Sequence, residues 1–141
     1  MRLFTVRDAE TLFPVLRKEV QKLRPAYYEL KSACEAFAKE YEISPDHPKV
    51  RDYCLENDHL QSLVEQVESS LCLFDDLGVQ CRGIERGLFD FPCIFDNQVV
   101  YLSWQTHEEK ITHWHDFDSG HSSRRPLLEP ENDFCTNEVY H

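Results

Sequence analysis

The chain has 141 residues, of which 41% are hydrophobic, and it carries a net charge of −11. This length and apolar content fit one folded domain with a real core. The acidic balance argues against nucleic acid as a partner, because binding to phosphates depends on Lys and Arg. The chain shows no charge-free apolar run of the roughly 18 residues that a membrane span needs, and its first residues are too charged for a signal peptide. We therefore expect a cytoplasmic protein without a membrane partner.

Residues 6–42 are predicted to be helical, because apolar side chains recur along them at alternating intervals of four and three residues. Thr5 followed by Asp8 fits an N-terminal cap, and Pro14 indicates that the first turns form a short separate helix. Pro25 predicts a kink and not an end, because the apolar spacing continues in register beyond it.

A second helix with the same heptad spacing is predicted over residues 46–77, and Gly78 fits a left-handed cap at its end. Asn57 falls on the apolar side of this pattern, either as a polar residue that sets the register, which we favour, or as a solvent-facing residue near a helix end. Residues 15–39 sum to +3 and residues 46–77 to −6, so the two helices are expected to pair as an antiparallel hairpin.

Over residues 88–116 the apolar spacing changes to two, which is typical of strands. Asp96-Asn97 suits the two-residue turn of a hairpin. Closing this turn predicts six opposed pairs: Phe95 with Gln98, Cys93 with Val100, Phe91 with Leu102, Phe89 with Trp104, Pro92 with Tyr101, and Asp90 with Ser103. One face of this ribbon is apolar and needs the helices to cover it.

A third strand is predicted over residues 110–115, with Trp114 opposite Leu102 and His115 opposite Tyr101. The face opposite the apolar one is then polar and is expected to be solvated; it carries Asp90, Tyr101, Ser103, His113 and His115. The predicted fold over residues 1–127 is α+β, with a long antiparallel helical hairpin packed on a small antiparallel three-stranded β-meander. Residues 128–141 contain neither Lys nor Arg and are expected to form a flexible acidic tail.

Histidine and aspartate are concentrated in residues 107–125. His113 and His115, two positions apart on a strand, point the same way and suit a zinc-like divalent transition metal ion, with Asp118 and His121 as further ligands. Ordinary side chains on a solvated face are the simpler interpretation. A third is a metal-free pocket for a polar ligand, in which His115 hydrogen-bonds to Tyr101 and acts as a general base.

Arg125 invites two interpretations. Its guanidinium group is suited to binding an anionic ligand through two contacts. More often such an arginine pins a loop by pairing with a nearby carboxylate, and Asp116 and Asp118 are at hand.

Three stretches carry a family resemblance: RLFTVRDAETLFPVLR at 2–17, GLFDFPCIFDNQVVYLSW at 87–104 and ITHWHDFDSGHSSRRPL at 111–127. They resemble the small bacterial family catalogued as domain of unknown function 2203. The resemblance implies a cytoplasmic bacterial protein with a long helical region, a β-rich part after it and no established activity.

The same resemblance ranks the polar residues. These positions match the family pattern: Asp90, Tyr101, Trp104, Trp114, His115, Gly120, Arg125 and Pro126. His113 and His121 stand where the family carries aromatic residues, and Ser103 stands where it tends to carry Cys. The resemblance therefore favours Asp90, His115 and Arg125 over a two-histidine metal site.

Two functions follow from these patterns. The sequence favours a non-enzymatic interaction or scaffold protein that self-associates through its helical hairpin, as a homodimer, because two helices and a small sheet leave apolar seams partly uncovered. The alternative is a metal- or anion-binding protein that uses the His/Asp/Arg cluster at residues 107–125, with hydrolysis as the activity to be considered. Its ligand-binding residues would be Asp90, Tyr101, His115 and Arg125.

Overall fold

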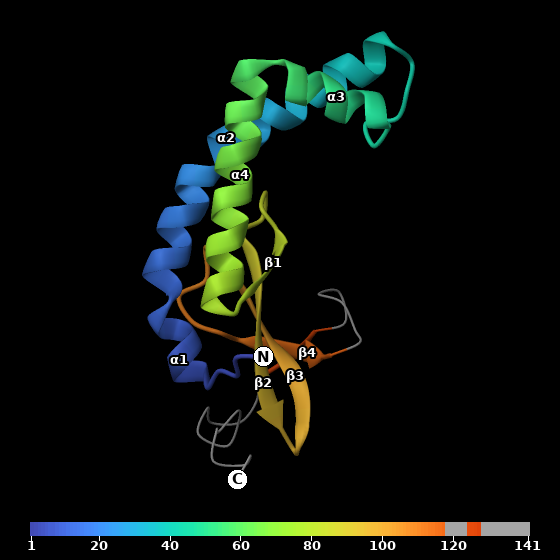
Figure 1. Cartoon of the computed structure of the whole chain (residues 1–141). Helices are drawn as coiled ribbons and strands as arrows, with labels where there is room; N and C mark the ends of the chain where they lie inside the picture. Colours follow the sequence, from blue (N-terminus) through green and yellow to red (C-terminus); the bar gives the residue numbers. More distant parts are fainter. Residues whose placement is uncertain (118–123, 128–141) are drawn as a thin grey trace. The chain divides into compact units, whose positions relative to one another are not determined.

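The computed structural model describes residues 1–117 and 124–127, which are drawn in colour in Figure 1. The described chain divides into two compact units. One unit comprises residues 1–18 together with the described chain from residue 74 onward, and the other comprises residues 19–73. The fold is a mixture of α-helices and one antiparallel sheet, so the predicted α+β class is confirmed. No helix of the described chain is long and apolar enough to cross a membrane. The predicted acidic tail, residues 128–141, lies outside the described residues.

The chain begins its helical part as two elements, α1 (Val6–Thr11) and α2 (Phe13–Glu40). The predicted cap of α1 is confirmed: Thr5 Oγ1 accepts a hydrogen bond from the backbone N–H of Asp8 at 3.0 Å, and the Asp8 carboxylate accepts one from the backbone N–H of Thr5 at 3.3 Å. This reciprocal pair satisfies two N–H groups that a helix start leaves without partners. Pro25 lies inside α2 without ending it, as its register predicted.

The prediction of one helix over residues 46–77 is wrong, because the structure has α3 (Pro48–Glu56) and α4 (Asp58–Leu77) with a break between them. Asn57 makes the break: its backbone is extended, and its side-chain oxygen accepts a hydrogen bond from the backbone N–H of Leu60 at 3.0 Å. An asparagine side chain competes in this way with helix hydrogen bonding. Asn57 is exposed, so it does not set a helix register.

Within the unit of residues 19–73, α2 and α4 run side by side in opposite directions (Figure 1). Ser70 near the end of α4 donates a hydrogen bond to Glu19 in the first half of α2 at 2.8 Å, and His59 at the start of α4 pairs with Glu29. A small core of Ala26, Cys54, Leu60 and Leu63 fills the space between the helices. This part of the chain is therefore a helical hairpin, interrupted at Asn57.

Within the described residues the sheet has five strands in chain order and not the predicted three: β1 (Gln80–Gly83), β2 (Leu88–Phe95), β3 (Gln98–Gln105), β4 (His113–Asp116) and β5 (Arg125–Pro126). All neighbouring strands are antiparallel. β4 begins at His113 and not at residue 110, because residues 106–112 form the loop before it. Short strands at both edges of the predicted meander were therefore missed.

The predicted register is confirmed. All six opposed pairs of β2 and β3 are present, and Leu102 faces Trp114, as Tyr101 faces His115, between β3 and β4. Asp96 and Asn97 form the turn with φ angles of 53° and 61°. Such left-handed angles at both turn residues match the twist of the flanking strands and fix the pairing.

The apolar face of the sheet is an aromatic cluster. Phe13 stacks on Trp104 with ring centroids 3.8 Å apart and planes at 7°, and Phe4 meets Phe91 edge-on at 5.3 Å. Phe74, close to the end of α4, contacts Phe89 edge-on at 4.9 Å. The cover of this face thus comes from the N-terminal residues, the start of α2 and the end of α4.

The opposite face of the sheet is buried, which corrects the prediction of a solvated surface. Asp90, Tyr101, Ser103 and His115 are each at most 3% exposed. The physical reason is β1, which adds Gln80 and Arg82 to the sheet edge, together with Phe117, whose ring stacks on Tyr101 at 5.1 Å. Polar side chains on this face therefore need partners inside the protein.

Glu108 organises the loop between β3 and β4. Its carboxylate accepts hydrogen bonds from the backbone N–H of Gln105 at 2.8 Å and from the hydroxyl of Thr112 at 3.1 Å. Its backbone carbonyl accepts from the indole N–H of Trp104 at 2.9 Å and from the guanidinium group of Arg17 at 2.6 Å. One residue thus ties the loop to the aromatic core and to α2.

Candidate functional site

The register of β2, β3 and β4 brings three of the predicted ligand-binding residues together. Asp90, Tyr101 and His115 lie on the same side of the sheet, because each occupies a position of the same parity in the confirmed pairing. His115 Nε2 is 3.0 Å from Asp90 Oδ2, and both side chains are almost completely buried, at 1% and 2% exposure. The sequence thus placed these residues correctly on one face.

Arg82 of β1 completes this group. Its Nε–H donates a hydrogen bond of 2.8 Å to the same oxygen of Asp90 that faces His115. The guanidinium group also lies over the ring of Tyr101, 5.1 Å from its centroid. A buried carboxylate needs such charged partners, because removing an unpaired charge from water is costly.

The imidazole of His115 is held from both sides. Its Nδ1 lies 2.9 Å from the backbone carbonyl of Asp116, which can only accept, so Nδ1 carries a proton and donates it. Its Nε2 faces Asp90. Both ring nitrogens are therefore directed at protein atoms, whereas a general base or metal ligand needs one nitrogen directed at its target.

Asp90 keeps one oxygen without a hydrogen-bond partner among the residues that the structure describes. This atom, Oδ1, is buried. His115 Nε2 is buried too, and it faces Asp90 Oδ2 at ion-pair distance but without the geometry of a hydrogen bond. The network thus has two polar atoms that are incompletely satisfied.

Tyr101 does not hydrogen-bond to His115 as one interpretation of the sequence expected. Its hydroxyl accepts a hydrogen bond from the side-chain amide of Gln80 at 2.9 Å, while the rings of Tyr101 and His115 are in contact with centroids 5.4 Å apart. The tyrosine is 3% exposed, so it is part of the packed interior.

Arg125 is exposed and pairs with Asp116, its NH2 group lying 2.9 Å from the carboxylate. It also lies over the ring of Trp114 at 5.0 Å. This is the loop-pinning arrangement that the sequence favoured for it.

The predicted metal ligands are only partly described. His113 Nδ1 is 2.8 Å from the hydroxyl of the adjacent Thr112, while Asp118 and His121 lie outside the described residues. Among residues 1–117 and 124–127, no three side chains of His, Cys, Asp or Glu gather as metal ligands would. The metal set of His113, His115, Asp118 and His121 stays a prediction.

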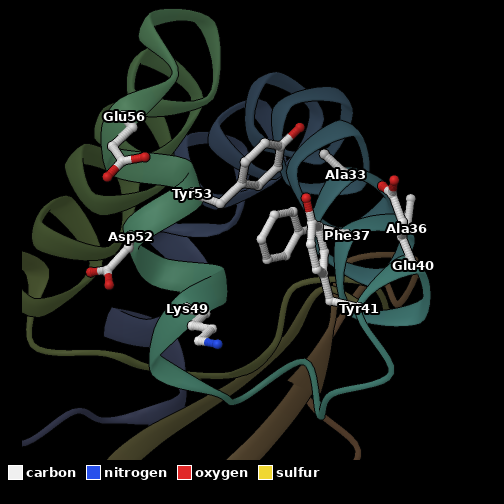
Figure 2. Close-up of a pocket in the computed structure, with 9 residues that line it drawn as sticks. All are labelled: Ala33, Ala36, Phe37, Glu40, Tyr41, Lys49, Asp52, Tyr53 and Glu56. Carbon is white, nitrogen blue, oxygen red and sulfur yellow. The ribbon is translucent and has the colours of Figure 1, made fainter.

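A second candidate site lies in the unit of residues 19–73. A pocket of about 620 Å³ opens between α3 and the last turns of α2 (Figure 2). Its lining comprises Ala33, Ala36, Phe37, Glu40 and Tyr41 from the α2 side and Lys49, Asp52, Tyr53 and Glu56 from α3. This volume falls within the range of ligand-binding pockets.

Three aromatic rings form the centre of this pocket. Phe37 stacks on Tyr53 with centroids 4.3 Å apart and planes at 13°, and Tyr41 lies against the same phenylalanine at 4.6 Å. Figure 2 shows the rings between the carboxylates of Asp52 and Glu56 on one side and Glu40 on the other.

A family model described as "Uncharacterized conserved protein (DUF2203)" matches residues 2–127. The chain belongs to this family. The match covers the elements from α1 to β5, so both candidate sites lie inside the family region, and the resemblance seen in the sequence is confirmed. No curated protein and no solved structure matches the chain.

Two residues of the buried network, Gln80 and Arg82, are absent from the sequence-based predictions. Their signal is weak, since β1 is only four residues long and contains a bulge after Cys81. Two polar residues at alternate positions just before a turn and an apolar strand are the available hint. No sequence pattern predicted the pocket. The heptad spacing indicates which side of α2 is apolar, but it does not indicate at which residue the partner helix stops covering that side.

Proposed function

We propose that this protein is a non-enzymatic interaction protein whose binding surface lies at the end of the helical hairpin, where α2 meets α3. One observation carries the proposal: the apolar side of α2 is buried in the first half of the helix and becomes exposed towards its C-terminal end. Val20, Leu23 and Ala26 are buried, whereas Phe37 is half-buried and Tyr41 is 59% exposed. Aromatic side chains with one face uncovered are typical of protein interfaces.

The sheet face gives less support to a catalytic function. Its polar residues are buried and face each other, and His115 lies between Asp90 and the Asp116 carbonyl. A reacting group needs access to a substrate and a free acid or base. The observed contacts instead suit a network that connects neighbouring strands.

Self-association through the hairpin, which the sequence favours, is one form of this function. A second copy and a different protein both gain from covering Phe37, Tyr41 and Tyr53. Light scattering at micromolar concentration distinguishes the two, because only self-association makes the mass of the pure protein depend on its concentration.

Site-specific photo-crosslinking in living cells tests the proposal. A photoreactive phenylalanine analogue replaces Tyr41 in one strain and the exposed Gln61 of α4 in another, each at native expression level. We expect a discrete crosslinked species from position 41 and not from position 61. No crosslink from position 41 in a folded variant, or the same species from both positions, would contradict the proposal.

A further inference from the structure

We propose that the pocket between α2 and α3 takes a cationic side chain, an arginine presented by a basic segment of a partner protein. This inference rests on the proposed function and adds the chemistry of the partner. The pocket combines stacked aromatic rings with carboxylates. A guanidinium group binds both at once, because its flat face packs on a ring while the N–H groups at its edge donate hydrogen bonds to a carboxylate.

The aromatic part of the argument concerns Tyr41 and the two rings behind it. Tyr53 and Phe37 stack face to face, so each shields one face of the other. Tyr41 lies next to them and is 59% exposed, which leaves much of its ring open to a ligand. A cation over such a face, within about 6 Å of its centre, is attracted by the ring quadrupole.

The same chemistry already occurs within this fold. Arg17 lies over Trp104 at 5.3 Å, Arg82 over Tyr101 at 5.1 Å and Arg125 over Trp114 at 5.0 Å. Two of these guanidinium groups also bind a carboxylate, Arg82 that of Asp90 and Arg125 that of Asp116. The pocket offers the same two elements, an open ring and carboxylates, to an arginine from a partner.

The charges of the pocket select a cation. Glu40, Asp52 and Glu56 provide three carboxylates against the single ammonium group of Lys49. Glu40 belongs to α2, whereas Asp52 and Glu56 belong to α3 (Figure 2), so both helices that line the pocket contribute negative charge. The net charge of −11 adds a longer-range attraction for a basic partner.

A second copy is a poorer occupant of this pocket. In a two-fold contact the same patch meets itself, so the carboxylates of one copy would face those of the other. Like charges brought together with loss of water repel each other. The charge pattern therefore favours a foreign basic segment over self-association at this point.

Binding of a fluorescein-labelled peptide with four arginines spaced by Gly-Ser tests the proposal, measured by fluorescence anisotropy on the full chain. The matched probe carries citrulline, which has the same shape without the charge. We expect the arginine peptide to bind about tenfold or more tightly than the citrulline peptide, since hydrogen bonds between charged groups are stronger than those of a neutral group. Equal affinities would overturn the inference.

A pair of charge variants separates the pocket from general electrostatic attraction. Asp52→Asn with Glu56→Gln removes two charges from the pocket, and Glu65→Gln with Glu68→Gln removes two exposed charges from α4. We expect the first double variant to weaken arginine-peptide binding about tenfold and the second by less than about twofold. Equal weakening by both would show that the peptide responds only to overall charge.

A ring series tests the cation–π contact, with circular dichroism to confirm that each variant is folded. Tyr41→Phe keeps the aromatic face and is expected to bind as well as the native chain, whereas Tyr41→Leu keeps apolar bulk and is expected to bind at least about threefold more weakly. Tyr28→Leu, at an exposed tyrosine of α2 outside the pocket lining, is the control and is expected to change nothing. Full binding by Tyr41→Leu would contradict the ring's role.

The outcomes separate this inference from the proposed function. If position 41 crosslinks to a protein but the arginine peptide shows no preference over citrulline, the hairpin end is an interface and the arginine inference is wrong. If light scattering shows a dimer that Tyr41→Leu weakens and that the double variant Asp52→Asn with Glu56→Gln strengthens, the occupant is a second copy. If neither crosslinking nor peptide binding occurs at the pocket, both proposals fail.

Discussion

His115 Nε2 lies 3.0 Å from Asp90 Oδ2, although the two residues belong to β4 and β2, which are separated by β3. The contact is diagonal, since Asp90 is paired with Ser103 and His115 with Tyr101. A single buried contact thus spans three strands, and Arg82 extends it to β1.

Replacing Asp90 by Ala is expected to destabilise the fold by about 1.5–3 kcal/mol, because the guanidinium group of Arg82 loses its acceptor and the buried His115 Nε2 loses the carboxylate that it faces. Urea unfolding followed by circular dichroism measures the effect. Asp116→Ala is the matched control, since its pair with Arg125 is about half exposed, and exposed pairs contribute about 0–1 kcal/mol. Equal losses from the two variants would show that the buried network does not stabilise the sheet.

Glu108→Ala is expected to cost about 2–3 kcal/mol, because the backbone N–H of Gln105 and the hydroxyl of Thr112 both lose their acceptor. Thermal or urea unfolding gives the difference, with the exposed neighbour Glu109→Ala as control, for which we expect less than about 0.5 kcal/mol. If the two variants unfold alike, the loop is not held by this carboxylate.

Asn57→Ala is expected to cost about 1 kcal/mol, because the cap on the backbone N–H of Leu60 is lost. Asn57→Asp keeps a side-chain acceptor and is expected to retain most of the stability, so it serves as the control. Hydrogen exchange of the first turn of α4 reports the effect locally. Faster exchange in Asn57→Ala alone supports the cap, and unchanged exchange contradicts it.

Cys34 makes stability depend on pH in the alkaline range. Burial, followed by the hydrogen bond with Cys54, raises the pKa of the Cys34 thiol from 9.0 to about 11. The folded chain therefore holds this proton where the unfolded chain has lost it, so the associated stability is present below about pH 9 and disappears as the pH rises towards 11. Urea midpoints between these pH values should fall more steeply in the native chain than in Cys34→Ser.

Cys72→Ser is the control for this pH dependence, because Cys72 is an exposed free thiol. Its midpoints are expected to follow those of the native chain. The assignment to Cys34 fails if the native chain and Cys34→Ser lose stability in parallel over the whole alkaline range.

The central hairpin of the sheet was predictable from the sequence because its information is local. The turn at Asp96-Asn97 fixes which residues oppose each other, and a side-chain period of two then assigns every residue of β2 and β3 to a face. The cap formed by Thr5 and Asp8 was predictable for the same reason, since its donor and acceptor are three residues apart.

The break at Asn57 and the edge strand β1 were not predictable in this way. Apolar spacing continues through Asn57, so the heptad pattern alone gives no sign that its side chain caps α4. β1 has four residues and a bulge, which leaves too little alternation to distinguish a strand from a loop.

The sequence by itself determined the family, the α+β class, the register of the hairpin and the separation of Trp104 from His115 on opposite faces. Only the tertiary structure decided that the polar face is buried and that Arg82 neutralises Asp90 there. The reason is physical. The direction of a side chain follows from the local backbone period, whereas its exposure depends on which other segments of the chain pack against it.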